Sequence, residues 1–154
     1  MELLLDTNLL VLLVVGLTDR GLILKHKRTR TFEPADYDLL LEILTSFDTV
    51  VVTPHVLAEA SNLLAQIGEP ALSTLRTTFA ALVEAQEEIY VAARDSVRQP
   101  AFLRLGLTDT AILELGKNEL ALLTTDVGLY LEAAKTNPLA ENFNHLRQAR
   151  LLGN

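Results

Sequence analysis

Three short, largely apolar runs mark this chain, at residues 3–5, 50–52 and Ala121–Thr124, and each is too short to be a helix. A polar residue follows each run, and a longer stretch with helical spacing of apolar residues begins there. Continuous apolar strands are typical of sheets that are buried on both faces, and strands that alternate with helices form parallel sheets. We therefore predict an α/β protein with a three-layer α/β/α architecture around a short, mainly parallel central sheet.

The helices are predicted from the spacing of apolar residues and from their start signals. The clearest signal is Thr53-Pro54, because threonine is a good N-cap residue and proline fits the first helical position. Thr108 is interpreted in the same way, as the N-cap of a helix that ends near Gly116. Further helices are predicted over residues 7–17, 34–45, 54–67 and 71–87, over part of 93–105 around Pro100, and after Ala121–Thr124 to about Lys135.

Three other segments give weaker signals. Residues 89–91 are predicted to form a short strand. Residues 18–34 are polar and basic, and they are predicted to form a loop or an irregular insertion. The tail at residues 142–147 fits either an edge strand or a helix, and the pattern alone does not choose between them.

The length of 154 residues suits a single domain, predicted over residues 1–154. The absence of cysteine excludes disulfides, thiolate zinc sites and a cysteine nucleophile. The longest apolar stretch, residues 9–17, is too short for a bilayer, which needs roughly 20 residues. Glu2 and Asp6 also stand where a signal peptide would carry basic residues. We therefore expect a cytoplasmic protein without a membrane partner.

Four acidic residues stand at the boundaries of predicted elements: Asp6, Glu59, Asp109 and Asp126. Taken singly, each has an ordinary explanation, because an aspartate near a helix start caps the helix or interacts with its dipole, and a helical glutamate is usually solvated. Taken in order, they form the set strand-Asp-Thr-Asn, helix-Glu, Thr-Asp at a helix start and strand-Thr-Thr-Asp. In parallel sheets, sites form beyond the carboxyl ends of the strands. Asp6 and Asp126 stand there, each just after a predicted strand.

This ordered set resembles the PIN-domain nuclease family over residues 3–130, and in size and motif order it resembles the VapC-type ribonuclease toxins. The resemblance implies a PIN-like fold and an endoribonuclease that depends on Mg²⁺ or Mn²⁺. It assigns the family's acidic residues to Asp6, Glu59, Asp109 and Asp126, and its small polar helpers to Thr7, Asn8 and Thr125. The insertion at residues 18–34 and the lack of a further acid directly after Asp126 depart from the toxin pattern, but they leave the nuclease interpretation intact.

A cluster of carboxylates is a coherent choice for Mg²⁺ or Mn²⁺, since both ions prefer oxygen ligands. Such an ion lowers the pKa of a bound water, aligns the scissile phosphate and stabilises the leaving oxygen. Asp6 and Asp126 are predicted to be direct metal ligands, together with Asp109. Glu59 is predicted to act through a water or to orient the nucleophile.

The net charge of −7 argues against a generic nucleic-acid binder, but the basic residues are unevenly distributed. One short segment is predicted to contact RNA through its cations, because lysine and arginine give affinity for phosphate without sequence preference. Its members are Lys25, Lys27, Arg28 and Arg30. The alternative is a solvated loop that only improves solubility.

The resemblance also implies a homodimer and, for a toxin, an antitoxin protein as partner. The main alternative function is a non-catalytic PIN-like module that binds RNA or acts as a scaffold. A receiver-type signalling domain is disfavoured, because the first run is followed by one acid rather than a pair. A dehalogenase-type phosphatase is disfavoured because Asn8 stands where its Asp-x-Asp motif needs a second aspartate.

Overall fold

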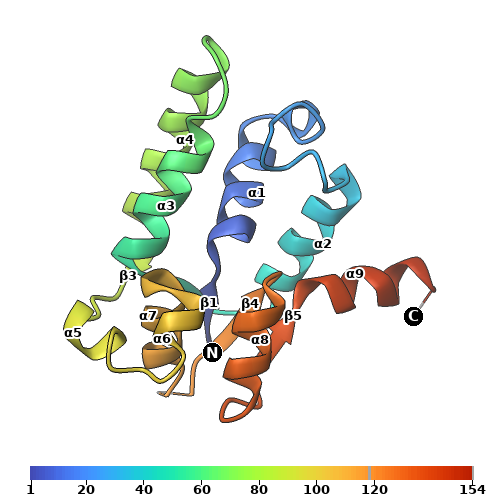
Figure 1. The fold of residues 1–154 in the computed structure, drawn as a ribbon. Coiled ribbons are helices and arrows are strands. Elements are labelled where there is room, and N and C mark those ends of the chain that lie inside the picture. The colour runs from blue at the N-terminus through green and yellow to red at the C-terminus, as the bar shows by residue number, and fades with distance from the viewer. Residues whose placement is uncertain (118, 154) are drawn as a thin grey trace.

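The computed structural model describes residues 1–117 and 119–153 and contains one five-stranded sheet, all parallel, with helices on both faces (Figure 1). This confirms the predicted three-layer α/β/α architecture. The elements are β1 (Glu2–Leu5), α1 (Thr7–Thr18), η1 (Arg20–Leu22), α2 (Pro34–Leu44), β2 (Thr49–Val52), α3 (Pro54–Leu64), α4 (Ala71–Ala85), β3 (Glu87–Glu88), α5 (Ala93–Ser96), α6 (Phe102–Leu105), α7 (Leu107–Gly116), β4 (Ala121–Thr124), α8 (Val127–Ala134), β5 (Ala140–Asn142) and α9 (Phe143–Leu151).

The strand order is β3-β2-β1-β4-β5, so β1 lies at the centre of the sheet. Leu4 of β1 is in register with Val51 of β2 on one side and with Leu122 of β4 on the other. The chain leaves β1 towards β2 and later returns through β4 on the opposite side. A reversal of this kind opens a crevice beyond the carboxyl ends of the two central strands.

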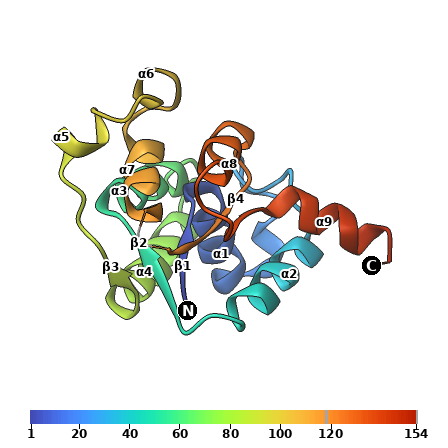
Figure 2. The same cartoon turned by 90° about the horizontal axis from the view of Figure 1, so that it is seen from below.

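The helices cover the two faces unequally. In Figure 2, α7 and α8 lie on one side of the strands, and α1, α2 and α4 lie on the other. Figure 1 shows α3 and α4 as a pair that extends away from the sheet, and α4 packs against α1 as well. Among the described residues, no helix is long and apolar enough to cross a membrane.

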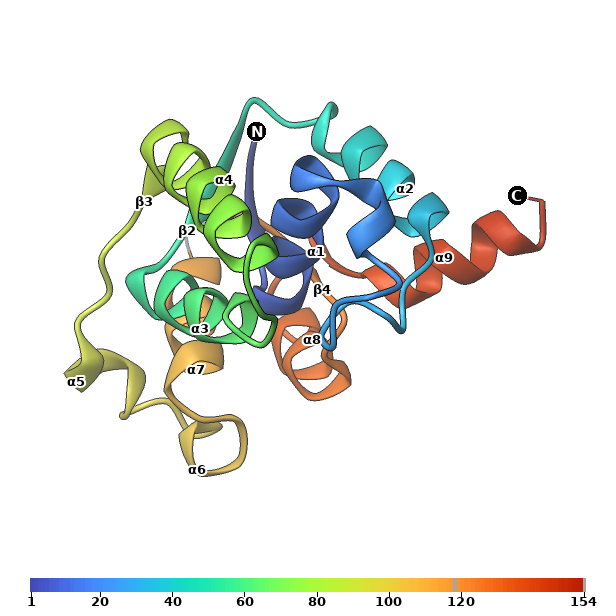
Figure 3. The same cartoon turned by 90° about the horizontal axis from the view of Figure 1, so that it is seen from above.

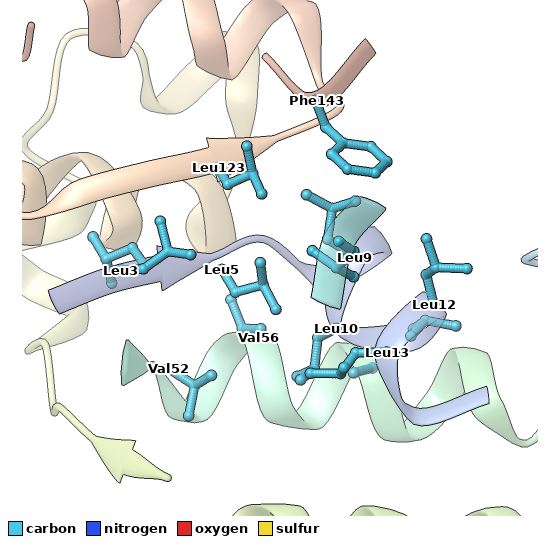
Figure 4. Packing of buried hydrophobic residues seen from close by; sticks show 14 of the residues in the cluster. Leu3, Leu5, Leu9, Leu10, Leu12, Leu13, Val52, Val56, Leu123 and Phe143 are labelled. Atoms are coloured by element: carbon cyan, nitrogen blue, oxygen red, sulfur yellow. The ribbon is translucent and has the colours of Figure 1, made fainter. Parts of the chain in front are cut away.

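The core is centred on α1, as its apolar sequence predicts. Every residue from Leu9 to Gly16 is buried, because this helix is enclosed by the sheet, α2, α3 and α4. Figure 4 shows Leu5 and Leu10 beside Val56 of α3, and Leu123 and Phe143 on the other flank of β1. Aliphatic side chains therefore fix the ends of β1 and β4, which are the strands that carry Asp6 and Asp126.

The strand predicted at residues 89–91 is wrong, because β3 is Glu87–Glu88. Val51 pairs with Glu87 and Val52 with Glu88, and the amide of Ile89 donates to the Val52 carbonyl at 2.9 Å. β2 ends there, so nothing remains for residues 90 and 91 to pair with. The edge strand is set by the length of its neighbour rather than by its own apolar residues.

The prediction for residues 93–105 is correct only in part, because the helix is split into α5 and α6 on either side of Pro100. The tail combines both options that the sequence left open. Residues Ala140–Asn142 form the edge strand β5, and Asn142 then caps α9 by accepting a hydrogen bond from the Asn144 amide at 2.9 Å.

Residues 18–34 are irregular, as predicted, but they pack against the core. Ile23, His26, Thr29 and Phe32 are buried at intervals of three residues. The Thr29 hydroxyl donates to the Ile23 carbonyl at 2.7 Å, and His26 Nε2 lies 3.1 Å from the Leu64 carbonyl. The segment therefore has a fixed shape, although its exposed residues are polar and basic.

Candidate active site

Asp6 directly follows β1 and is only 4% exposed. Its Oδ1 accepts a hydrogen bond from the Thr7 amide at 2.7 Å, and its Oδ2 accepts one from the Thr124 hydroxyl at 2.5 Å. Burial raises the pKa of Asp6 above its ordinary value, and the two hydrogen bonds act in the opposite direction. Both oxygens thus have partners, and the carboxyl group is held rigidly at the end of the central strand.

Thr124, the last residue of β4, connects Asp6 to Asp126. Its hydroxyl donates to Asp6 and accepts from the Asp126 amide at 2.9 Å. Asp126 in turn caps α8, since its Oδ1 accepts from the Leu129 amide at 2.8 Å. Capping by Asp6 and Asp126 is therefore real, and it also orients both carboxylates at the ends of adjacent strands.

Asp109 lies in the first turn of α7, and Gly106 stands at the cap position in place of the predicted Thr108. The prediction for Thr108 is wrong because the helix begins one residue before it. Gly106 has φ 85° and ψ 179°, a backbone conformation that strongly favours glycine. Burial, and then the negative charges of Asp6, Asp126 and Glu59, raise the pKa of Asp109 to about 7.

Glu59 lies on the exposed side of α3 and is tied to α7. Its Oε2 accepts a hydrogen bond from the Thr108 hydroxyl at 2.6 Å. This bond spans two helices that pack against each other next to the sheet. In Figure 3, α3, α7 and α8 lie near one another, and α7 packs against both α3 and α8, so residues from distant parts of the chain come together.

One cavity of about 400 Å³ is lined by all of the acids that the sequence singled out, Asp6, Glu59, Asp109 and Asp126. Thr7, Asn8 and Thr108 also line it, and the buried Thr7 hydroxyl has no hydrogen-bond partner. Thr125, the third predicted polar helper, instead lines a neighbouring cavity. The structure therefore brings the four acids and two of the three helpers to one place.

The donor chemistry of this cavity suits a hard divalent cation. Its lining combines carboxylate, hydroxyl and amide oxygens with no lysine or arginine among the described residues, and the oxygen of Thr7 is an orphaned polar atom. In this arrangement, however, no three Asp, Glu or His side chains of residues 1–117 and 119–153 are grouped closely enough to hold one metal ion. The residues fit Mg²⁺ or Mn²⁺ in kind.

The basic segment divides into two pairs. All four side chains are exposed, but Lys27 and Arg28 line the neighbouring cavity, whereas Lys25 and Arg30 line neither this cavity nor the acidic one. His26, between Lys25 and Lys27, is fully buried, and its Nδ1 accepts a hydrogen bond from the Arg28 amide at 3.0 Å. The segment therefore carries exposed cations next to a buried histidine, and its contact with RNA stays a prediction.

Sequence reasoning missed three residues that shape the site. Thr124 ends an apolar strand and binds Asp6, and Gly106 shows its importance only through its backbone angles. Arg147, on α9, lines the neighbouring cavity although it is far away in the sequence. The Thr-Thr-Asp motif was the available signal for Thr124, but it pointed equally to Thr125.

A comparison with protein-family models gives no match, and neither does a comparison with curated proteins.

Proposed function

We propose that this chain is a metal-dependent endoribonuclease that hydrolyses phosphodiester bonds in single-stranded RNA. One observation carries the proposal: Asp6, Glu59, Asp109 and Asp126 come from four separate parts of the chain and line the same cavity at the carboxyl ends of β1 and β4. Burial and the mutual repulsion of these carboxylates are both unfavourable for folding, and together they raise the pKa of Asp109 to about 7, so such convergence favours a functional explanation.

Asp6, Asp109 and Asp126 would hold the cation, and Thr124 and Thr7 would keep Asp6 in place. When bound, Mg²⁺ or Mn²⁺ supplies positive charge that makes water more acidic and offsets the charge of the phosphate. Glu59 is anchored by Thr108 and orients the attacking water. Glu59 Oε1, the carboxylate oxygen that does not accept from Thr108, is placed to take up the proton that this water loses.

In this reaction, a bond forms between the water oxygen and phosphorus, and the bond to the 3′ oxygen breaks. The products are a 5′-phosphate and a 3′-hydroxyl, and the leaving oxygen receives a proton. The Asn8 amide is exposed at the mouth of the cavity, where it can donate to a phosphate oxygen. The start of α1 adds the positive end of a helix dipole.

The resemblance to VapC-type toxins extends the proposal to partners. It makes the chain a candidate toxin that forms a homodimer and is neutralised by an antitoxin protein. The alternative, a non-catalytic PIN-like module, is favoured by one observation, namely that no three acids among the described residues are grouped to hold one ion. The two functions differ in whether the protein cleaves RNA in a metal-dependent way.

The test is an RNA cleavage assay with mixed-sequence single-stranded RNA in Mg²⁺, in Mn²⁺ and in excess EDTA. We expect cleavage with either metal, none in EDTA, and products that carry a 5′-phosphate. Asp6→Asn should lower the rate at least about 100-fold, because even residues that only support a metal ligand typically contribute 10- to 100-fold. Glu84→Gln, which removes a charge from an exposed site on α4, is the matched control and should retain full activity. Undiminished cleavage in EDTA, or by Asp6→Asn, would exclude the proposed mechanism.

A further inference from the structure

A second cavity, of about 390 Å³, adjoins the acidic one and shares Asn8 with it. Its walls come from three distant segments. Lys27 and Arg28 belong to the loop before α2, Thr125 belongs to the turn after β4, and Asn144 and Arg147 belong to α9. In Figure 3, the blue loop that precedes α2 runs beside the start of α9, and Arg147 Nη2 donates to the Thr31 carbonyl in that loop.

The two adjoining cavities have opposite charge. Lys27, Arg28 and Arg147 line the second cavity, and no acid lines it among the residues that the structure describes. Asp36 pairs with Arg147 at 2.9 Å and with Arg150 at 3.4 Å, so the charge of Arg147 is partly offset. Lys27 and Arg28 therefore carry most of the positive charge at this cavity.

Two of the three cations of the second cavity, Arg28 and Arg147, are held in place before any ligand arrives. Arg28 Nε donates to Gln66 Oε1 at 2.7 Å, and the Arg28 amide is fixed by the buried His26. The Arg147 guanidinium lies 5.0 Å from the centre of the Phe32 ring and donates to Asn144 Oδ1 at 3.0 Å. Because these side chains lose little freedom on binding, they would bind an anion more tightly than free surface cations do.

We infer that the second cavity binds a phosphate of the RNA strand next to the one that is cleaved. The inference rests on the proposed function, since the acidic cavity is where the scissile phosphate would lie. A strand that crosses Asn8 from one cavity to the other presents one phosphate to the carboxylates and a neighbouring one to Lys27, Arg28 and Arg147. The acidic cavity repels RNA in the absence of metal, so the basic cavity supplies the affinity that holds the strand across it.

The test measures binding without cleavage, with a short fluorescein-labelled oligouridylate in EDTA, by fluorescence anisotropy over a series of salt concentrations. The test variant is Lys27→Ala/Arg28→Ala. The matched control is Lys25→Ala/Arg30→Ala, which removes the same charge from the same segment but from residues outside the cavity. All four side chains are exposed, so both variants should fold, as circular dichroism would verify.

We expect the test variant to bind roughly tenfold more weakly than the wild type, with a salt slope shallower by about 0.7, the value for one neutralised phosphate on a single strand. The control should bind within about twofold of the wild type. Equal weakening by both variants would overturn the inference, because affinity would then follow net charge alone. The outcome is separate from that of the cleavage assay. If the wild type does not cleave RNA but the test variant binds RNA more weakly than the control, the binding site stands and the proposed function fails. If the wild type cleaves RNA but the two variants bind equally, the proposed function stands and the binding site fails.

Discussion

At the scale of single residues, Thr124 and Asp109 show how this site is organised. Thr124 gives its hydroxyl hydrogen to Asp6 and accepts the amide of Asp126, so one side chain joins the two central strands at their ends. Asp109 shows the consequence of placing acids together, because burial and its acidic neighbours raise its pKa to about 7. Hydrogen bonds therefore position Asp6 and Asp126, although the negative charges of the acids repel one another.

Replacing Thr124 with valine should damage both stability and activity. The change leaves the buried Asp6 Oδ2 without its donor and the Asp126 amide without its acceptor, which should cost about 1–3 kcal/mol of unfolding free energy. RNA cleavage should fall roughly 10- to 100-fold, as for other residues that orient a metal ligand. Urea denaturation and the cleavage assay check the two effects. Thr124→Ser keeps the hydroxyl and should restore most of the activity, and a serine variant as inactive as valine would contradict this role.

The stability of the metal-free protein should depend on pH through Asp109. Its pKa is raised to about 7 in the fold, above the ordinary value of 3.8, so the folded state holds the proton more tightly than the unfolded chain. Stability from this group is therefore fully present below about pH 4 and is lost as the pH rises through 7. Melting in EDTA between pH 5 and pH 8 should show a decrease for the wild type and for Glu84→Gln. The decrease should be smaller for Asp109→Asn, and an equal decrease would mean that Asp109 titrates normally.

At the scale of elements, the buried strands and their helices could be predicted, and the elements at the edges could not. The apolar runs of β1, β2 and β4 and the Thr53-Pro54 signal of α3 are local features that burial on both faces requires. By contrast, β3 takes its place from the pairing of Glu87 and Glu88 with β2. The start of α7 depends on the backbone of Gly106, which is determined by the surrounding chain rather than by a capping side chain.

The close approach of α1 and α2 gives a prediction that is independent of function. A Cβ added at Gly16 would lie 2.2 Å from Tyr37 Cδ2, so the glycine is needed for these helices to pack. Gly16→Ala should therefore destabilise the protein by about 1–3 kcal/mol, the usual cost of overpacking a core. Gly68→Ala is the matched control, since no atom lies within 4 Å of the added Cβ. If urea denaturation shows the two variants to be equally stable, α1 and α2 do not pack as closely at Gly16 and Tyr37 as the structure shows.

At the scale of the whole molecule, the strand order explains how the four acids meet. Asp6 and Asp126 follow neighbouring strands at the centre of the sheet, and α3 and α7 bring Glu59 and Asp109 to the same end. The order of the acids along the sequence predicted this meeting, but the partition of the basic segment could not be predicted. That partition comes from the fold of the segment, in which the buried His26 contacts the Leu64 carbonyl at the end of α3 while Lys27 and Arg28 line the second cavity.

The central claim is that Asp6, Asp109 and Asp126 hold one metal ion, and it can be tested without knowing the RNA target. A ligand that binds only the folded state stabilises it by about 2.7 kcal/mol at about 100 times its Kd. For a chain of 154 residues this corresponds to a rise in Tm of roughly 5–10 °C.

The decisive measurement is therefore the change in Tm on adding Mg²⁺ to the wild type, Asp6→Asn and Glu84→Gln, each first stripped of metal with EDTA. We predict a clear rise for the wild type and Glu84→Gln and a rise of less than half that size for Asp6→Asn. We also predict that metal-free Asp6→Asn is at least as stable as the wild type. The substitution removes a buried carboxyl group whose pKa is raised by burial, so the folded variant no longer has to bury that charge. An equal response to Mg²⁺ in all three proteins would show that Asp6 is not a ligand and would contradict the metal site.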